Sequence, residues 1–204
     1  MSGPGLVLVL DGPTMVGRTT TLHALQRAWP QVRSGPLLEA GLDAAVHSFG
    51  PTAARWAELV LPSVPPSDAE QPRVTWGPLG RELVAGMHRV AAAWARSGMD
   101  VAMDHSLFNH ATVVDLHAAL EGLEVVHVGL VCDPDVLDDR EREVGSPTRG
   151  LAVAQLRAHR AEVRPDLVKT SFNWRAFSSR IPSFTLIPAS ASLLKPRPDT
   201  MGLG

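Results

Sequence analysis

Residues 6–20 read LVLVLDGPTMVGRTT, and the expected architecture follows from them. The run Leu6–Leu10 is too short for a helix and rich in branched apolar residues, which is typical of a strand buried on both faces. Beyond Gly17, apolar residues recur at helical spacing until Pro30 stops the pattern. These residues are Leu22, Leu25 and Trp29. The segment therefore predicts a strand, a glycine-containing turn and a helix.

Strands and helices alternate along much of the remaining chain. The patterns predict helices at 79–95, 113–123, 135–143 and 151–163, and strands at 101–104, 125–132 and 184–187. Such alternation is typical of βαβ units around a parallel sheet, so we expect the α/β class. One interruption, Leu61–Pro78, holds five prolines and predicts an irregular loop, of the kind that often forms a lid or a binding site.

The length of 204 residues suits one domain with a core of its own. We expect a single domain over residues 1–187 and a flexible tail over 188–204, where proline and serine are frequent. The 19 basic and 21 acidic residues give a net charge of −2, which excludes a broadly basic nucleic-acid-binding protein. The sequence leaves open whether the chain forms a homo-oligomer.

The sequence also limits the cellular location. No apolar run reaches the roughly 18 residues of a membrane-spanning helix, so we expect no membrane partner. The N-terminus lacks the basic segment of a signal peptide. Cys132 is the single cysteine, which excludes intrachain disulfides and CxxC motifs. These features predict a cytoplasmic protein.

The segment Gly12–Thr19 has the spacing of a phosphate-binding loop, G-x4-G-K-[ST], with arginine in place of lysine. The glycines let the backbone wrap around a phosphate, and the following helix N-terminus adds partial positive charge. The cation of Arg18 would reach the β and γ phosphates of a nucleotide, and the Thr19 hydroxyl would ligate Mg²⁺. We therefore predict that ATP or GTP binds with Mg²⁺. The predicted nucleotide-binding residues of this loop are Gly12, Pro13, Thr14, Met15, Val16, Gly17, Arg18, Thr19 and Thr20.

Two considerations weigh against that interpretation. A glycine-rich turn also joins strand and helix in doubly wound folds that bind no nucleotide. Arginine is planar, longer and forked, so it is not interchangeable with lysine at a crowded site, although Arg18 keeps the charge.

Three short motifs follow within residues 128–155: VGLVCD at 128–133, RER at 140–142 and GLAVAQ at 150–155. They resemble the VGxxCD strand, the RE-containing helix and the GxA-x2-Q helix of the chloramphenicol phosphotransferase-like P-loop kinases. The likeness extends from about Leu6 to Ser171. It implies a three-layer P-loop NTPase fold of the nucleoside-monophosphate-kinase type, with a parallel sheet flanked by helices. It also implies ATP-dependent phosphorylation of a hydroxyl on a small molecule.

The resemblance assigns the general base to Asp43. Leu42-Asp43 resembles the family's step of a hydrophobic residue followed by aspartate after the first helix. A carboxylate there could take the proton of the acceptor hydroxyl. The alternatives are that Asp43 caps a helix, a position that aspartate favours, or that Glu39 is the base.

Asp104 ends a predicted inner strand, where doubly wound folds bind their ligands. In the resemblance it matches the first residue of a paired acidic motif, whose second position is His105 here. We predict that Asp104 and Thr19 hold Mg²⁺, and that Asp104 and His105 contact the substrate. A strand-end cap is the alternative for Asp104. A zinc site built from nearby histidines and carboxylates is disfavoured, because the spacings do not share one helical face; those residues are Asp104, His105, His110, Asp115 and His117.

Three arginines surround a Gly/Pro turn. Arg140 matches a lid arginine of the family, which would meet the transferring phosphoryl group and act in catalysis. Arg142 and Arg149 lie where they could replace lid arginines, since Val144–Pro147 departs from the family's Arg-Gly-Asp-Arg-like lid. We predict that both bind the nucleotide. A solvated, charged helix is the alternative.

Together these features predict a small-molecule O-phosphotransferase. It would transfer the γ-phosphoryl group of ATP or GTP to a hydroxyl of an antibiotic or a secondary metabolite. Asp43 would take the proton, Arg18 and Mg²⁺ would hold the nucleotide, and Arg140 would close over the phosphoryl group. Two alternatives remain: a nucleotide- or ligand-binding protein without kinase activity, and a P-loop scaffold reused for other chemistry on an anionic substrate.

Overall fold

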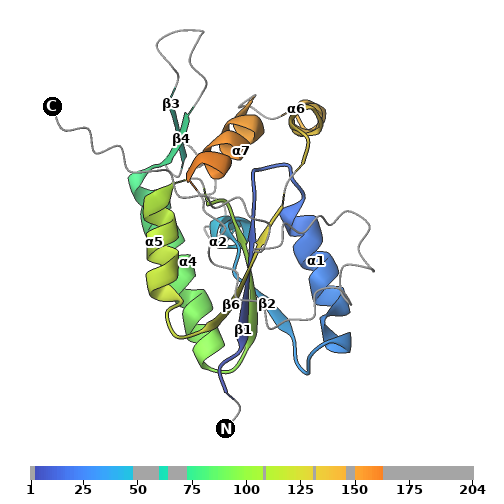
Figure 1. Ribbon diagram of the computed structural model, residues 1–204, viewed down its shortest axis with the longest axis vertical. Helices are drawn as coiled ribbons and strands as arrows, with labels where there is room; N and C mark the ends of the chain where they lie inside the picture. Colours follow the sequence, from blue (N-terminus) through green and yellow to red (C-terminus); the bar gives the residue numbers. More distant parts are fainter. Residues whose placement is uncertain are drawn as a thin grey trace, which may run out of the picture.

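The computed structural model describes residues 3–47, 60–63, 73–107, 109–130, 132–145 and 150–162. A four-stranded parallel sheet forms the centre, with helices on both faces, as Figure 1 shows. Its strands, in spatial order, are β2 (Leu37–Glu39), β5 (Asp100–His105), β1 (Leu6–Asp11) and β6 (Glu124–Gly129). The predicted α/β architecture, a parallel sheet between helical layers, is confirmed.

The helices follow the predicted alternation closely. Pro30 falls in the short 3-10 helix η1 (Trp29–Gln31), which follows the first helix directly. Gly98 lies just past the longest helix with a φ of 93°, a left-handed conformation that favours glycine. The helices are α1 (Arg18–Ala28), α2 (Leu42–His47), α4 (Pro78–Arg96), α5 (His110–Ala119), α6 (Pro134–Glu143) and α7 (Leu151–Glu162).

The central strand β1 is buried on both faces, as its unbroken apolar run predicts. Its residues alternate between two cores. Leu6, Leu8 and Leu10 pack with residues of α1, whereas Val7 and Val9 pack with residues of α4 and α5. This one strand therefore contributes side chains to the cores on both faces of the sheet.

The strand predicted at 125–132 differs from the structure. β6 covers Glu124–Gly129, and only Val126 and Val128 are buried within it. β6 lies at the edge of the described sheet, so one of its faces is covered less completely than those of β1. An apolar run of this kind does not by itself separate an edge strand from a central one.

The loop predicted at Leu61–Pro78 is corrected by the structure. Within it, β3 (Val60–Ser63) and β4 (Arg73–Trp76) pair as an antiparallel ribbon. Proline is tolerated in edge strands because it need not donate a ladder hydrogen bond, and both strands of a two-stranded ribbon are edges. Pro78 instead begins α4, a position where its missing N–H costs nothing.

Several predictions fall outside the described residues: the strand at 184–187, the tail at 188–204 and the position of Arg149. None of the helices in the described ranges combines the length and apolar composition needed to cross a bilayer.

Candidate phosphate-binding site

The carboxyl ends of β1 and β5 meet beside the predicted phosphate loop. In the parallel register Leu10 lies opposite Asp104, and Asp11 lies opposite His105. Gly12 continues directly from β1, so the loop begins next to the carboxylate of Asp104. Parallel pairing of two strands distant in sequence therefore builds this site.

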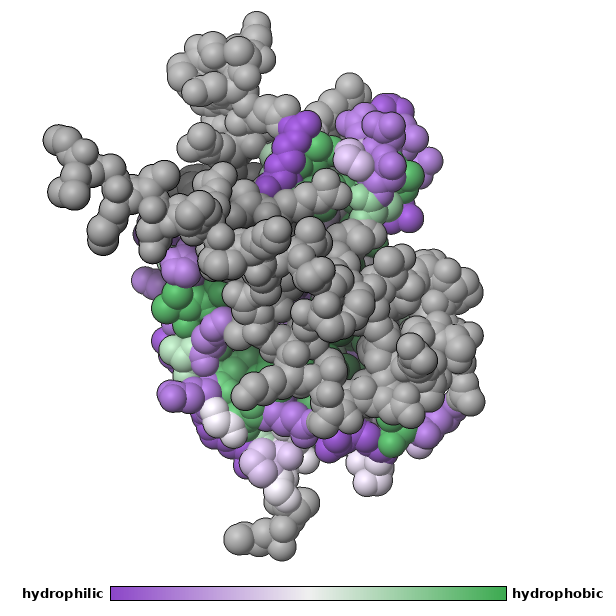
Figure 2. All heavy atoms as spheres, in the orientation of Figure 1, coloured by the Kyte–Doolittle hydropathy of each residue, from purple (hydrophilic) through white to green (hydrophobic). Residues whose placement is uncertain are grey.

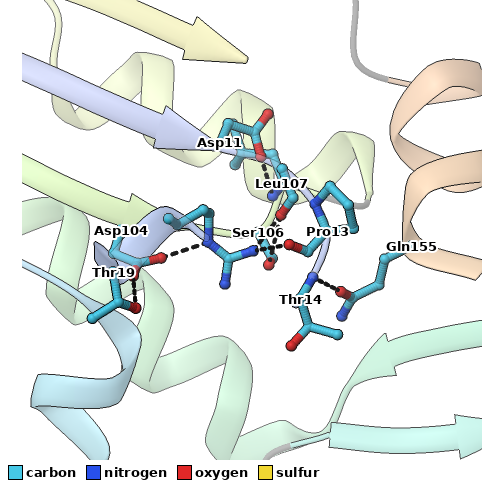
Figure 3. Close-up of polar contacts among 10 residues, drawn as sticks. Asp11, Pro13, Thr14, Thr19, Asp104, Ser106, Leu107 and Gln155 are labelled. Atoms are coloured by element: carbon cyan, nitrogen blue, oxygen red, sulfur yellow. Dashed lines mark hydrogen bonds and ion pairs between the residues drawn. The ribbon is translucent and has the colours of Figure 1, made fainter. Parts of the chain in front are cut away.

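Arg18, the residue in the lysine position, bridges the loop and β5. Figure 3 shows Asp104 beside Thr19, and Gln155 pointing toward Thr14. Its Nε donates to Oδ1 of Asp104 at 2.5 Å. Its Nη1 donates to the carbonyl oxygens of Gly12 and Pro13, the latter at 2.8 Å. The Arg18 and Asp104 side chains are 16% and 5% exposed, so the ion pair is largely shielded from water. Nη2 makes no hydrogen bond to the described part of the chain and is the donor left for an anion.

Thr19 shares the same carboxylate. Its hydroxyl donates to Oδ2 of Asp104 at 2.6 Å. Mg²⁺ prefers oxygen ligands and usually keeps several waters beside one or two protein ligands and the substrate phosphates. A hydroxyl and a carboxylate placed together fit that pattern. The structure thus brings together Arg18, Thr19 and Asp104.

Two residues of the loop have left-handed backbone conformations. Met15 has a φ of 62°, and Gly17, which precedes α1, has φ 98° and ψ 28°. At Gly12 an added Cβ would lie 2.6 Å from the carbonyl oxygen of Leu130, so only glycine fits. The N–H of Thr14 donates to Oε1 of Gln155 at 2.7 Å, which couples the loop to α7.

The helix pair α6–α7 lies against the loop. Arg140 Nη1 donates to the Met15 carbonyl at 2.8 Å, so the predicted lid arginine does contact the loop. Glu141 is buried and accepts the N–H groups of Gly150 and Ala152, at 2.8 and 2.7 Å. This carboxylate therefore caps the start of α7 and joins it to α6. Apolar side chains complete the contact: Leu137, Ala152 and Leu156, with Met15 and Val16 packed against them.

Arg142 is not brought to the loop. It is exposed and pairs with Asp139 and Asp138 of its own helix, at 2.7 and 2.6 Å. Hydrogen bonds to these two carboxylates raise the pKa of Arg142. Figure 2 shows this part of the surface, over α6, as strongly hydrophilic. The solvated-helix interpretation describes Arg142 in this structure.

The two candidate bases lie near the end of β2. Asp43 belongs to α2, but its side chain lies outside what the structure describes. Glu39 ends β2. A Cβ added at the nearby Gly41 would lie 3.2 Å from Oε1 of Glu39 and 3.3 Å from the Cβ of Asp104. Glu39 is therefore close to the Arg18–Asp104 pair.

Asp104 and His105, neighbours in sequence, face opposite sides of the sheet. Asp104 points toward α1, whereas Nε2 of His105 lies 2.7 Å from Nε2 of His88 in α4. Successive strand residues alternate in direction, so these two side chains lie on different faces of the sheet. Burial lowers the pKa of His105 to about 3. In the described ranges, no group of three or more His, Cys, Asp or Glu side chains is placed to hold a metal ion.

Three anchoring contacts were not anticipated from the sequence. Oδ1 of buried Asp11 accepts the N–H of Leu107 at 2.9 Å, and its Oδ2 lies 3.2 Å from Nε2 of His127. The Ser106 hydroxyl donates to the carbonyl of Gly12 at 3.1 Å. These contacts fix the start of the loop. A carboxylate between a buried strand and the first loop glycine is the one signal that could have indicated them.

The sequence as a whole identifies the family. A model of chloramphenicol phosphotransferase-like proteins matches residues 5–174. The chain belongs to the chloramphenicol phosphotransferase-like protein family. The predicted resemblance is thereby confirmed. Among curated proteins, none matches this chain.

Solved structures show the same fold for this chloramphenicol phosphotransferase-like protein. A sugar kinase from Janibacter sp. HTCC2649 has 18% identity and a TM-score of 0.50, over 81% of this chain and 83% of its own. The structure of APE1195 has 15% identity and a TM-score of 0.51, over 69% of this chain and 68% of its own. Family membership, together with a P-loop kinase fold, supports a small-molecule phosphotransferase.

Proposed function

We propose that the chain is a kinase that transfers the γ-phosphoryl group of ATP or GTP to a hydroxyl of a small molecule, either an antibiotic or a secondary metabolite. One observation carries this proposal: Arg18, Thr19 and Asp104 converge beside the loop that begins at Gly12. A cation, a hydroxyl and a carboxylate at the start of a helix are what binding a metal–nucleotide complex requires.

The α1 face of the sheet is the nucleotide side in this proposal. Arg18 would use its Nη2 donor on the β and γ phosphates while its Nε and Nη1 stay on Asp104 and the loop. Thr19 and Asp104 would hold Mg²⁺. When bound, Mg²⁺ supplies neutralisation of the charge on the phosphate oxygens. Arg140 would exchange the Met15 carbonyl for a phosphoryl oxygen.

The α4 face is the acceptor side. α2, which carries Asp43, contacts α4 and β5, and Leu42 packs against the core that holds Met87 and Met103. The acceptor oxygen would attack the γ phosphorus as the bond from phosphorus to the bridging oxygen breaks. The electron pair leaves with the nucleoside diphosphate, and the hydroxyl proton passes to Asp43. Glu39, beside Asp104, is the competing base.

A second candidate is a nucleotide-binding protein without turnover. The observation that favours it is that most polar atoms of the site already have hydrogen-bond partners within the protein. Both oxygens of Asp104 and two nitrogens of Arg18 are hydrogen-bonded. A nucleotide could bind such a site without the γ-phosphoryl group being aligned for transfer.

Calorimetric titration of ATP, GTP and ADP, with and without Mg²⁺, tests the nucleotide side. A transfer assay with labelled γ-phosphate over a panel of hydroxylated antibiotics and metabolites then tests turnover. The kinase proposal expects Mg²⁺-dependent binding and transfer to some of these acceptors. Binding without transfer to any acceptor supports the second candidate, and acceptor binding without nucleotide binding indicates reuse of the scaffold for other chemistry.

The base is tested by two conservative variants. Asp43→Asn should lower transfer by at least about 100-fold, the scale of general base catalysis, while nucleotide affinity stays unchanged. Glu39→Gln serves as the comparison. If Glu39→Gln causes the larger loss, Glu39 is the base.

A further inference from the structure

A line of polar side chains, two of them buried, runs through the α4 face, outside the hydrogen bonds of the phosphate loop. Asp115 of α5, His88 of α4 and His105 of β5 form it, and we call these three residues the histidine relay. Asp115 Oδ2 lies 2.7 Å from Nδ1 of His88, and the two Nε2 atoms of the histidines lie 2.7 Å apart. Both rings are almost fully buried, whereas the Asp115 side chain is 33% exposed and also pairs with Arg89.

Counting protons fixes the direction of these hydrogen bonds. A carboxylate only accepts, so Nδ1 of His88 carries a proton and donates to Asp115. Burial lowers the pKa of His88, so that ring is neutral at pH 7 and its Nε2 is bare. Nε2 of His105 must therefore donate to it. In a neutral ring this leaves Nδ1 of His105 without a proton, as a hydrogen-bond acceptor.

That acceptor has no donor in the described part of the chain, although Nδ1 of His105 is buried. Nearly all buried polar atoms in native proteins are hydrogen-bonded, so such an atom calls for a partner from outside. His105 lies at the carboxyl end of β5, on the face where α2 contacts α4 and β5. In the proposed function this is the side that receives the acceptor hydroxyl.

We propose that Asp115 and His88 are positioning residues that hold His105 in the tautomer whose Nδ1 accepts a hydrogen bond from a donor group of the acceptor molecule, separate from the O–H proton that passes to Asp43. This inference rests on the proposed function, which supplies the acceptor molecule. The relay selects acceptors that carry a donor at this position, because an ether or a methyl group there would leave Nδ1 unpaired.

The first measurement concerns tautomers and needs no substrate. A long-range ¹H–¹⁵N spectrum of the full chain, labelled on histidine, shows which ring nitrogen carries the proton. We expect the proton on Nε2 of His105 and on Nδ1 of His88. In Asp115→Asn the amide can donate to or accept from His88, so His105 should show both tautomers. Arg89→Gln removes the ion pair at Asp115 but leaves its bond to His88, so the spectrum should stay unchanged.

The second measurement uses Mg²⁺–ATP with water as the acceptor, because one O–H of water can donate to His105 while the other proton passes to Asp43. It reads ADP release and nucleotide affinity separately. Asp115→Asn should lower turnover about tenfold and change the dissociation constant for ATP less than twofold, because Arg18 and the loop are untouched. Asp115→Glu, which keeps a carboxylate, should recover part of the turnover. Arg89→Gln should match the wild type.

The outcomes separate this inference from the proposed function. If the wild type fails to bind Mg²⁺–ATP, the proposed function is wrong, whatever the histidine tautomers. A proton on Nδ1 of His105 in the wild type, or a tautomer that survives Asp115→Asn, overturns the positioning role. A tautomer change with unaltered turnover overturns the contact with the acceptor.

Discussion

Arg18 shows how one substituted residue can serve two roles. A lysine ammonium is a compact point charge, whereas the guanidinium fork reaches Asp104 and two loop carbonyls at once. The arginine thereby links β5 to the loop and neutralises a carboxylate that is 5% exposed. The Arg18 side chain therefore stabilises the fold, in addition to its proposed contact with phosphate.

A double-mutant cycle tests the bond between Arg18 and Asp104. The coupling between Arg18→Ala and Asp104→Ala in urea unfolding should be about 1.5–3 kcal/mol, the range for hydrogen bonds to charged groups. Arg33 pairs with Asp100 beyond the other end of α1, so Arg33→Ala and Asp104→Ala should be additive within about 0.5 kcal/mol. Coupling near zero for the first pair would show that the ion pair contributes nothing to stability.

Gly12 and Gly86 should respond oppositely to the same substitution. Gly12→Ala places a Cβ 2.6 Å from the Leu130 carbonyl, so the free energy of unfolding should fall by about 1–3 kcal/mol. Gly86 lies within α4 with open space around it, so Gly86→Ala should raise that free energy by up to about 1 kcal/mol. Thermal melts of both variants decide this, and equal melting temperatures would contradict the steric argument at Gly12.

At the scale of elements, α6 and α7 act as one unit because a single carboxylate joins them. The buried Glu141 carboxylate accepts two backbone N–H groups at the start of α7, which have no partner within the helix itself. Through Arg140 and Gln155 the pair then contacts the loop at Met15 and Thr14.

Loss of the Glu141 charge should loosen this pair. In Glu141→Gln one acceptor oxygen is lost and the other bond loses its charge, so amide hydrogen exchange should accelerate across residues 134–145 and 150–157. β1 and β5 should keep their protection. The exposed neighbour offers a matched control, Glu143→Gln, which should leave exchange in both helices as it is. Unchanged exchange in Glu141→Gln would mean that apolar contacts alone hold α7.

The elements that the sequence predicted are those with long periodic patterns. α4 and α7 have enough turns for an apolar stripe to stand out, and β1 has an unbroken apolar run. β2 has three residues and α2 six, so neither has a readable period. The β3–β4 ribbon was missed because its prolines, tolerated at an edge, read as loop signals.

The candidate site could be predicted only for residues that are neighbours in the sequence. Arg18 and Thr19 directly follow Gly17, so their position at the loop could be predicted. The anchoring of Asp11 by Leu107 depends on the register between β1 and β5, which no local pattern specifies. The opposite directions of Asp104 and His105 follow from strand alternation, once Asp104 is placed in the strand and not at its cap.

At the scale of the whole molecule, the buried histidines should make stability depend on pH. Their folded pKa values lie below the ordinary 6.5, that of His105 at about 3, because burial disfavours the charged ring. The unfolded chain therefore binds more protons below pH 6.5. Stability is full above about pH 6.5 and falls as the pH drops toward 3, at no more than about 1.4 kcal/mol per pH unit for each ring.

Urea midpoints measured between pH 5 and 7.5 test this, in a range above most carboxylate titration. The wild type should lose stability below pH 6.5, and His105→Gln should lose less. A wild-type midpoint that is flat across this range would show that the rings stay accessible to protons in the folded state.

The bonds from Gln155 and Arg140 to the loop have a thermodynamic consequence. If a nucleotide binds as proposed, a phosphate oxygen that takes the Thr14 N–H displaces the Gln155 side chain, and Arg140 leaves the Met15 carbonyl. The measured affinity would then be the intrinsic one multiplied by the fraction of molecules in which these two bonds are open.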